Sequence, residues 1–513
     1  MEAKLTTETI NFFDKKLDTV FTHEETAEII VPDAMLDILE IIDTKGMVTV
    51  KDKEAENGRV VFTGMVNAEV LYRPEEEDKI CRLELGIPFT AMVEAAEVTP
   101  DSQLYSMVHL GCLDSRMINS RKALVRADVV VEVAAYELSE LTWSMDLNDD
   151  SDAGIEVLRD KGEVTLVTQI KEKSFVIAEE FTLPAGKAPI EEIYRTGVEI
   201  NNEDVKSVGN KLIFKGEIII DILYRGSGET EPQRLEYTAP FSQIIEMDND
   251  IEDAVFAVKL ILTNCYIDGE SAISEENRAV AAEVHLSAQA LCKEKFYIPF
   301  ISDVYCAKYE LSESREDISA VSEMMPHMIS GEVREIVELA EPVFKILDCH
   351  FTIGKATCTE EDGAMCAKTS VCASAMYMTD EGKIRGINRR FEVKGTGECN
   401  NETASGISAR IMEDARASAM GNSIEFLIPV QFEICPSTRF KSSSVCGASW
   451  DEEGERDLSA LPSIVVHHAL ENETIWNMAK KYCSSKELII EVNGIEEDME
   501  PEAGRILIIP RKG

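Results

Sequence analysis

The sequence lacks any apolar run of the roughly 20 residues that a membrane span needs, so we expect no membrane insertion. Charges interrupt every short apolar patch from Met1 to Lys16, and we expect no secretory signal there. Basic residues are also scarce: 51 Lys and Arg stand against 96 Asp and Glu, which leaves a formal net charge of −45. Because such a field repels nucleic acid and anionic lipid, neither is an expected partner. The acidity favours solubility first, and capture of basic partners is the alternative.

Paired cysteines are missing as well. The thirteen cysteines never form a C-x-x-C pair, and their odd number and low density argue against a disulfide framework. We expect most of them to be buried thiols in a protein that remains in the cytosol. Cys349, His350 and Cys358 lie close together, but no second pair at ligand spacing follows them. We therefore predict no metal site.

Motifs of catalysis are absent from the sequence. It contains no G-x-S-x-G, no P-loop and no H-E-x-x-H. The histidines are dispersed except for His467 and His468, which sit on a predicted strand where one of the two must face outward. Glu94 and Glu246 recur at equivalent places, and repetition favours a structural role over a catalytic one. We predict no catalytic residue, no cofactor and no enzyme activity.

What the sequence does contain is a long internal repeat. Gly58–Arg73 matches Asn210–Arg225, and Arg82–Phe89 matches Arg234–Phe241, with the same separation of 152 positions in both pairs. A constant offset without gaps indicates duplication. A third and more diverged copy is recognised at Ala364–Tyr377.

Each copy has the composition of a β-rich unit, so the fold class is mainly β. Phe62–Tyr72 and Phe214–Tyr224 are rich in β-branched residues, and turn residues follow them. The matching pairs near the front of each copy predict either a short helix or an extended segment; they are Ile38/Ile41, Ile190/Ile193 and Phe344/Leu347. Residues 405–420 have a helix-like composition. The predicted order is a first unit at 20–140, a second at 155–300, a diverged third at 301–440, a polar linker at 441–462 on which the last domain moves, and that domain at 463–513.

The last domain is predicted to run strand, helix, helix, strand. Ile464–Val466 is a β-branched run, and Thr474 is a candidate N-cap for a first helix that ends by Cys483. Ser484 with Glu487 has the form of a capping box for a second helix. That helix is expected to bury Leu488, Ile489 and Val492 and to end at Gly494. A final strand is predicted at Ile506–Ile509.

With its Thr474-Ile-Trp, the Asn493 before Gly-Ile and the Gly…Leu-Ile-Ile-Pro ending, this domain resembles a LysM module. The resemblance implies a β-α-α-β fold that commonly binds glycans containing N-acetylglucosamine. Two loops border the glycan groove of that family, and here they are rich in carboxylates, which suit a basic protein surface equally well. The candidate partner or glycan groove comprises Asn472, Glu473, Thr474, Ile475, Glu496, Asp498 and Met499. We expect Trp476 to pack in the core, with sugar stacking as the alternative.

The Phe-Lys-Gly…Leu-Tyr-Arg and Arg-Leu-Glu…Pro-Phe strands, with the Tyr297–Glu310 passage, are similar to the SPOCS domain of spore coat proteins in endospore-forming Firmicutes. Several such units before one LysM module resemble the clostridial coat proteins that interact with stage IV sporulation protein A. This implies a scaffold at the forespore surface in the mother-cell cytoplasm, which binds that coat-basement ATPase and other spore coat proteins. The alternative is a weak peptidoglycan binder attached to the spore cortex.

Overall fold

The computed structural model describes residues 1–75, 79–148, 153–249, 254–268, 278–361, 364–398, 403–451, 453–458, 462–496 and 499–511. The chain is mainly β, as predicted. Three stretches, which we call the first, second and third units, each pass through a long strand, several shorter strands and another long strand. The first unit comprises β1 (Lys4–Ile30), β2 (Ile38–Glu56), β3 (Arg59–Pro74), β4 (Cys81–Glu94), β5 (Gln103–Asn119) and β6 (Lys122–Asn148).

The other two units follow the same order. The second comprises β7 (Ile155–Thr182), β8 (Ile190–Val208), β9 (Lys211–Gly226), β10 (Pro232–Glu246), β11 (Val255–Asp268) and β12 (Ala279–Cys306). In the third, the first long strand is divided in two, and short extra strands occur; its strands are β13 (Ser312–Glu323), β14 (His327–Glu338), β15 (Val343–Ile353), β16 (Thr357–Glu361), β17 (Ala364–Thr379), β18 (Ile384–Glu398), β19 (Thr403–Ile411), β20 (Arg416–Met420) and β21 (Ser423–Ser449).

Each unit folds as a two-layer sandwich. In the first unit the sheet β2-β3-β4 packs on β1, β6 and β5, and in the second β8-β9-β10 packs on β7, β12 and β11. In the third, β15, β17 and β18 face β14 and β21. The inward residues of both layers form one apolar core per unit. A tyrosine at the end of the third strand closes two of these cores from the same position, since Tyr72 donates to the Leu36 carbonyl (3.0 Å) and Tyr224 to that of Ala188 (3.3 Å).

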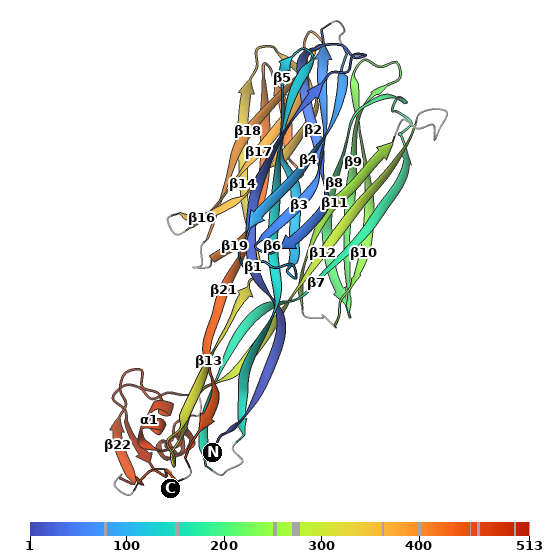
Figure 1. The fold of residues 1–513 in the computed structure, drawn as a ribbon. Helices are drawn as coiled ribbons and strands as arrows, with labels where there is room; N and C mark the ends of the chain where they lie inside the picture. Colours follow the sequence, from blue (N-terminus) through green and yellow to red (C-terminus); the bar gives the residue numbers. More distant parts are fainter. Residues whose placement is uncertain are drawn as a thin grey trace.

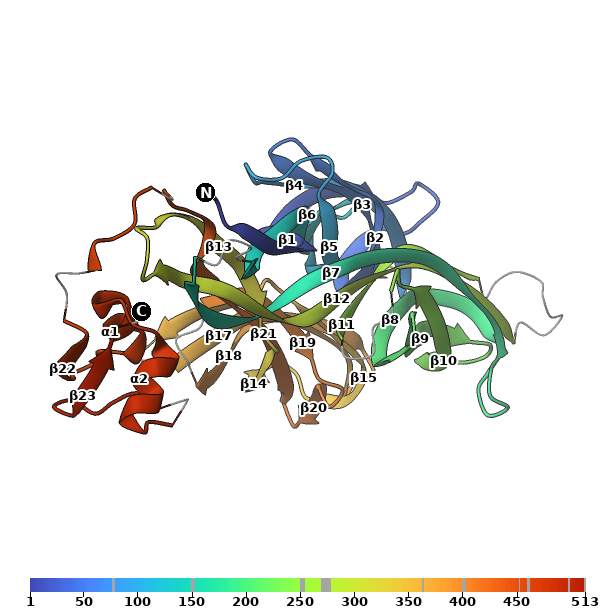
Figure 2. The ribbon, with the colours of Figure 1, turned by 90° about the horizontal axis from the view of Figure 1, so that it is seen from below.

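The long strands extend beyond the sandwiches as three antiparallel ribbons, which we call the stem (Figure 1). The ribbons are 4–15 with 136–148, 155–167 with 293–306, and 312–323 with 437–449. All three contribute to a shared apolar core that includes Phe12, Trp143, Leu166, Phe300 and Ile318. The three sandwiches, which we call the head, lie at one end of this stem, and Figure 2 shows them as three lobes seen along it.

The structure corrects several predicted boundaries. The limits at 20, 140 and 300 fall inside β1, β6 and β12, because each unit also owns the stem portion of its long strands. Residues 405–420 are not helical: β19 and β20 both pair with β21, and this pairing outweighs their helix-like composition. Residues 441–449 do not belong to a linker, since they continue β21 and pair with β13. Of the two alternatives for Ile38 and Ile41, the extended one is correct.

The three units meet along one axis in the head through β2, β8 and β15. These strands share two bulges at matching places, and β2 and β8 each have a third further along; the second shared bulge directly precedes Asp43, Arg195 and Asp348. A bulge turns an extra side chain out of its own sandwich. The side chains so released, with residues of the adjoining strands, form a separate apolar cluster between the units, which includes Ile42, Tyr194, Leu71, Leu223 and Met376.

A buried ion triad occupies the same axis. Arg195 of the second unit is 1% exposed and pairs with Asp43 of the first unit and with Asp348 of the third. Asp43 also accepts hydrogen bonds from the Ser374 hydroxyl (2.6 Å) and contacts His350 Nε2 (3.0 Å). Burial, the largest influence, would raise the pKa of Asp43, but the charges of His350 and Arg195 and these hydrogen bonds hold it well below its usual range. All three units therefore contribute charges to one buried cluster.

A second buried ion cluster lies where the head meets the stem, and it also joins three units. Glu323, at the end of β13, contacts Lys15 of β1 (2.6 Å) and Lys293 of β12 (2.5 Å). The Tyr136 hydroxyl donates to the same carboxylate (3.1 Å). Burial opposes ionisation of Glu323, but the two lysines outweigh it and lower its pKa to about 2.

We predict that Arg195→Met destabilises the folded chain by about 3 to 5 kcal/mol, because it leaves two buried aspartates without their shared cation. Urea unfolding followed by fluorescence measures this. Arg389→Met, an exposed head residue, serves as the control. The triple variant D43N/R195M/D348N should be more stable than Arg195→Met alone. Equal stability of Arg195→Met and the control would show that the triad does not hold the head together.

Glu323 gives a prediction of pH dependence. Its folded pKa lies below the ordinary value of 4.5, so its contribution is complete above pH 4.5 and is lost as the pH falls towards 2. A shift of that size corresponds to about 3 kcal/mol. Glu323→Gln should remove this stability at pH 7 and flatten the loss between pH 4.5 and 3, measured by thermal unfolding. Glu316→Gln, exposed on the same strand, should behave like the unmodified chain.

Candidate functional site

The C-terminal residues form a small module, which we call the tail module (residues 463–511). It comprises β22 (Ile464–His468), α1 (Ile475–Tyr482), α2 (Lys486–Asn493) and β23 (Ile506–Pro510). The predicted limits of α1 are confirmed: Thr474 is its N-cap, where its hydroxyl accepts from the Asn477 N–H, and Cys483 ends it with a left-handed φ of 52°. Ile475, Met478 and Ala479 point into the core of the module.

The second helix begins one residue later than predicted. Ser485, not Ser484, is the N-cap and accepts from the Leu488 N–H, while the Ser484 hydroxyl donates to the Pro510 carbonyl and so ties the helix to β23. Of the residues predicted to be buried by α2, Ile489 is buried, whereas Val492 is exposed. Because α2 is short, only one of its sides meets the core.

The tail module is docked on the end of the stem, and this differs from the mobile domain that we expected. Asp303 of β12 accepts hydrogen bonds from the Trp476 indole (2.8 Å) and from the Lys480 ammonium (2.7 and 2.9 Å). The Tyr305 hydroxyl donates to the Ser484 carbonyl (2.9 Å). Burial would raise the pKa of Asp303, but these donors lower it. Four polar contacts therefore hold the tail module against the second unit.

Trp476 is buried, as predicted, but its surroundings include the stem. Trp476 and Lys480 are one helical turn apart on α1, so they share the face that meets Asp303, and the indole packs edge-on against Tyr305 with ring centroids 4.8 Å apart. Its indole is therefore not an open sugar-stacking platform. It joins the tail module to the stem.

The residues of the predicted groove separate into different roles. Ile475 is fully buried, so its side chain cannot contact a ligand, and its backbone N–H donates to Glu500 (2.7 Å). Glu473 is engaged locally with His467 Nε2 (2.7 Å) and the Leu470 N–H (3.0 Å). His468, in contrast, faces outward as expected for its strand position.

The rest of the predicted groove lies in exposed loops. Asn472 adopts a left-handed φ of 63°, and Glu496 and Met499 are exposed in the loop after α2, where the Met499 N–H donates to the Glu496 carbonyl (3.0 Å). Asp498 lies outside the described residues. Sequence reasoning thus identified two exposed loops, but it included core and cap residues with them.

Sequence reasoning missed one feature, the solvent-facing side of the two-stranded sheet of β22 and β23, which we call the outer face. Four apolar side chains stand side by side on it: Ile464 (60% exposed), Val466 (64%), Ile506 (59%) and Ile508 (41%). Val466 lies directly opposite Ile508, and the alternate residues Leu507 and Ile509 are buried. Apolar residues on both sides of a short strand were the available signal, because a half-buried strand usually carries polar residues outward.

One edge of this small sheet is closed. The Asn493 side chain donates to the Ile508 carbonyl (2.6 Å) and accepts from the Ile508 N–H (2.7 Å), as a neighbouring strand would. A partner strand therefore cannot pair with β23 at Ile508, whereas the apolar outer face is open to a partner.

Two general findings apply to the part of the chain that the structure describes. No group of three or more His, Cys, Asp and Glu side chains there is placed to hold a metal ion. His350, from the short Cys/His stretch, contacts Asp43. No helix in the same part is long and apolar enough to cross a membrane.

Comparison with known proteins identifies two of the units. Residues 37–118 and 189–269 both match a family model described as the SipL, SPOCS domain. The two matches begin 152 positions apart, and each covers the second to fifth strands of its unit. Comparisons with curated proteins and with solved structures find no match.

Two of the three units therefore contain SPOCS domains, which relates the chain to the proteins of the spore coat. The two matched segments, which together cover less than half of the chain, are similar to the SPOCS domain of SipL. The third unit shares the strand order of the other two and lies outside both segments.

We predict that Asp303→Ala releases the tail module from the stem without unfolding it. The loss of a charged hydrogen-bond acceptor costs about 2 kcal/mol, which increases the undocked fraction roughly 30-fold. Limited proteolysis between residues 451 and 462 should accelerate, and small-angle scattering should show a larger particle. Asp160→Ala, exposed on the stem, is the control. Unchanged proteolysis would contradict the docking.

Proposed function

We propose that this protein is a non-enzymatic scaffold of the developing spore coat, which joins stage IV sporulation protein A, the coat-basement ATPase, to other coat proteins at the forespore surface in the mother-cell cytoplasm. Two observations support the coat assignment: the SPOCS matches and the three-unit architecture that contains them. The tail module, which resembles a LysM module, is the proposed docking element for the ATPase.

The outer face of β22 and β23 is the observation that carries this proposal. Four β-branched or apolar side chains from two paired strands are exposed together, and soluble proteins rarely leave such a cluster uncovered unless it binds something. The stem covers the Trp476 face of α1, so the outer face lies on a different side of the tail module. A protein can therefore cover the outer face while the tail module stays docked.

The SPOCS units supply the rest of the scaffold. Their ion triad and shared stem core make one body of three units, so a partner bound to the tail module is held at a fixed position relative to the head. Loops and sheet surfaces of the head are the proposed contact regions for other coat proteins. This arrangement suits a spacer between two coat components.

We predict that Val466→Glu reduces retention of stage IV sporulation protein A by the full chain at least tenfold in a pull-down with both proteins purified. A carboxylate in the centre of an apolar contact costs several kcal/mol when it is desolvated. Val208→Glu is the matched control, because Val208 is 64% exposed at the end of β8 in the head, the same fraction as Val466. Ile508→Glu, opposite Val466, should repeat the effect.

The same experiment separates the outer face from the loops. If Glu496→Lys abolished retention and Val466→Glu did not, the partner would bind the carboxylate-rich loops instead. If the full chain failed to retain the ATPase but bound insoluble peptidoglycan or N-acetylglucosamine oligomers with micromolar affinity, the scaffold proposal would be wrong and cortex attachment would replace it.

A further inference from the structure

The boundary between the first and third units differs from the other two, because no connecting segment of the chain crosses it. The chain itself connects the first unit to the second, between β6 and β7, and the second to the third, between β12 and β13. No segment of the chain runs from the third unit back to the first, although backbone hydrogen bonds join the two at the stem end, from the Ala3 N–H to the Ala448 carbonyl (2.8 Å) and from the Trp450 N–H to the Met1 carbonyl (3.0 Å). The three units surround one axis, and this is the boundary in the head that no connecting segment of the chain crosses.

Noncovalent contacts hold that boundary at close range. Thr352 of β15 donates to the Gly111 carbonyl (3.0 Å), and the His109 ring contacts the Ile353 carbonyl (3.1 Å). At Gly386 the backbones come so close that a Cβ atom would lie 1.5 Å from the Ile42 carbonyl oxygen. These contacts keep the boundary closed without fixing it covalently.

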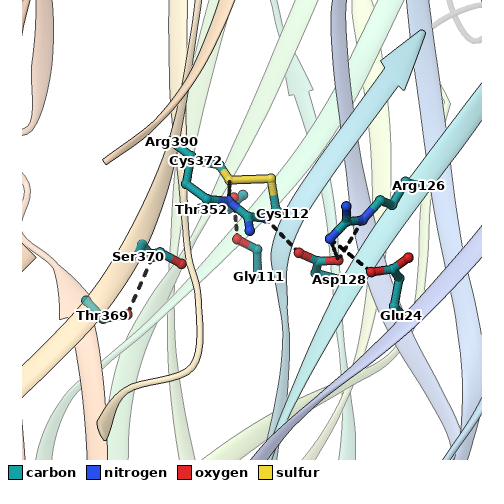
Figure 3. The surroundings of a disulfide bond; sticks show 10 residues. All are labelled: Glu24, Gly111, Cys112, Arg126, Asp128, Thr352, Thr369, Ser370, Cys372 and Arg390. Carbon is teal, nitrogen blue, oxygen red and sulfur yellow. Dashed lines mark hydrogen bonds and ion pairs between the residues drawn. A yellow bond between two sulfur atoms is a disulfide. The ribbon is translucent and has the colours of Figure 1, made fainter. Parts of the chain in front are cut away.

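One disulfide crosses this same boundary. Cys112 of β5 and Cys372 of β17 are bonded across a Cα–Cα distance of 5.7 Å, and 260 positions separate them in the sequence (Figure 3). We expected most cysteines to be buried thiols, and the ten others that the structure describes form no disulfide. The bond converts a linear series of three units into a covalently closed ring.

A cation lies beside one of the two sulfur atoms. Arg390 Nε is 3.4 Å from Cys372 Sγ, and its Nη2 is anchored on Asp128 of the first unit (2.7 Å), as Figure 3 shows. Both cysteines are buried, but Arg390 is half-exposed, so the sulfur atoms lie just beneath the surface. A guanidinium at this distance favours the thiolate form of a cysteine, which is the nucleophile in disulfide exchange.

We propose that Cys112 and Cys372 form a redox clasp: a dithiol while the surroundings are reducing, and a disulfide that closes the head into a ring when a low-molecular-weight disulfide accumulates. The Cys372 thiolate attacks the small disulfide, forms a mixed disulfide and releases one thiolate. Cys112 then attacks Cys372 Sγ and releases the second. The protein loses two electrons, the small disulfide gains them, and the protons of both cysteines pass to the released thiolates.

The clasp is independent of the scaffold proposal, because it rests on the head and not on the tail module. The clasp controls whether the boundary between the first and third units can open in the head. In the dithiol form the first and third sandwiches can part in the head while the stem still holds the three units together, and in the disulfide form they cannot. Amides of β5, β15 and β17 should therefore exchange with solvent more slowly after oxidation.

The test uses the full chain in buffers of reduced and oxidised glutathione. After denaturation and alkylation, peptide mass spectrometry should show Cys112 and Cys372 becoming protected together as the buffer becomes oxidising. Hydrogen exchange of β5, β15 and β17 should slow at least tenfold in the same samples. Cys112→Ser should abolish both effects, and Cys366→Ser, a buried cysteine of β17, should retain them.

Arg390 is tested as a positioning residue for the thiolate. Arg390→Gln should slow formation of the disulfide severalfold, Arg390→Lys should restore most of the rate because it keeps the charge, and Arg389→Gln should have no effect. If Cys112 and Cys372 were alkylated equally in both buffers, or if oxidation left the exchange of β5, β15 and β17 unchanged, the clasp would be refuted. Equal rates in Arg390→Gln and Arg389→Gln would refute the role of Arg390.

Discussion

The architecture depends on one buried cation. Arg195 lies on the axis between Asp43 and Asp348, and each of the three comes from a different unit at a matching bulge. Buried charges tolerate few arrangements, because each must be paired in place. The three units place an aspartate, an arginine and an aspartate at equivalent positions, so the contacts around the axis are not identical. Three copies of one unit could not form this triad, because their charges at that position would all have the same sign. It thereby holds the second unit, which carries the arginine, against both units that carry an aspartate.

Much of the local structure could be predicted from the sequence. The paired strands of the first two units follow from β-branched runs between turn residues, and the limits of α1 follow from Thr474 and the spacing of its apolar face. These features depend on neighbours in the chain. Residues 405–420 show the limit of such reasoning, since small residues suited to a helix are recruited as strands by β21.

The association of the units was harder to predict, because it uses faces that a single sandwich would leave exposed. A signal existed in Ile222, Leu223 and Tyr224, and in Val70, Leu71 and Tyr72, where strands lose their polar alternation and both faces are buried. The ion triad gave no such signal, since its members differ in type at matching positions. The fold of the tail module was predicted from its own residues, but its docking was not. Asp303, which positions it, lies more than 150 residues earlier in the sequence.

The stem has a consequence for synthesis. Its first strand carries Phe12, which shares the core with Ile318 and Phe440 of the third unit. A ribosome delivers these residues in order, so the first ribbon must wait with its apolar side uncovered until the third unit has emerged. The sandwiches can form one after another during this time, whereas the stem can only close last. The tail module, made after the stem strands, then covers Tyr305 at the stem end.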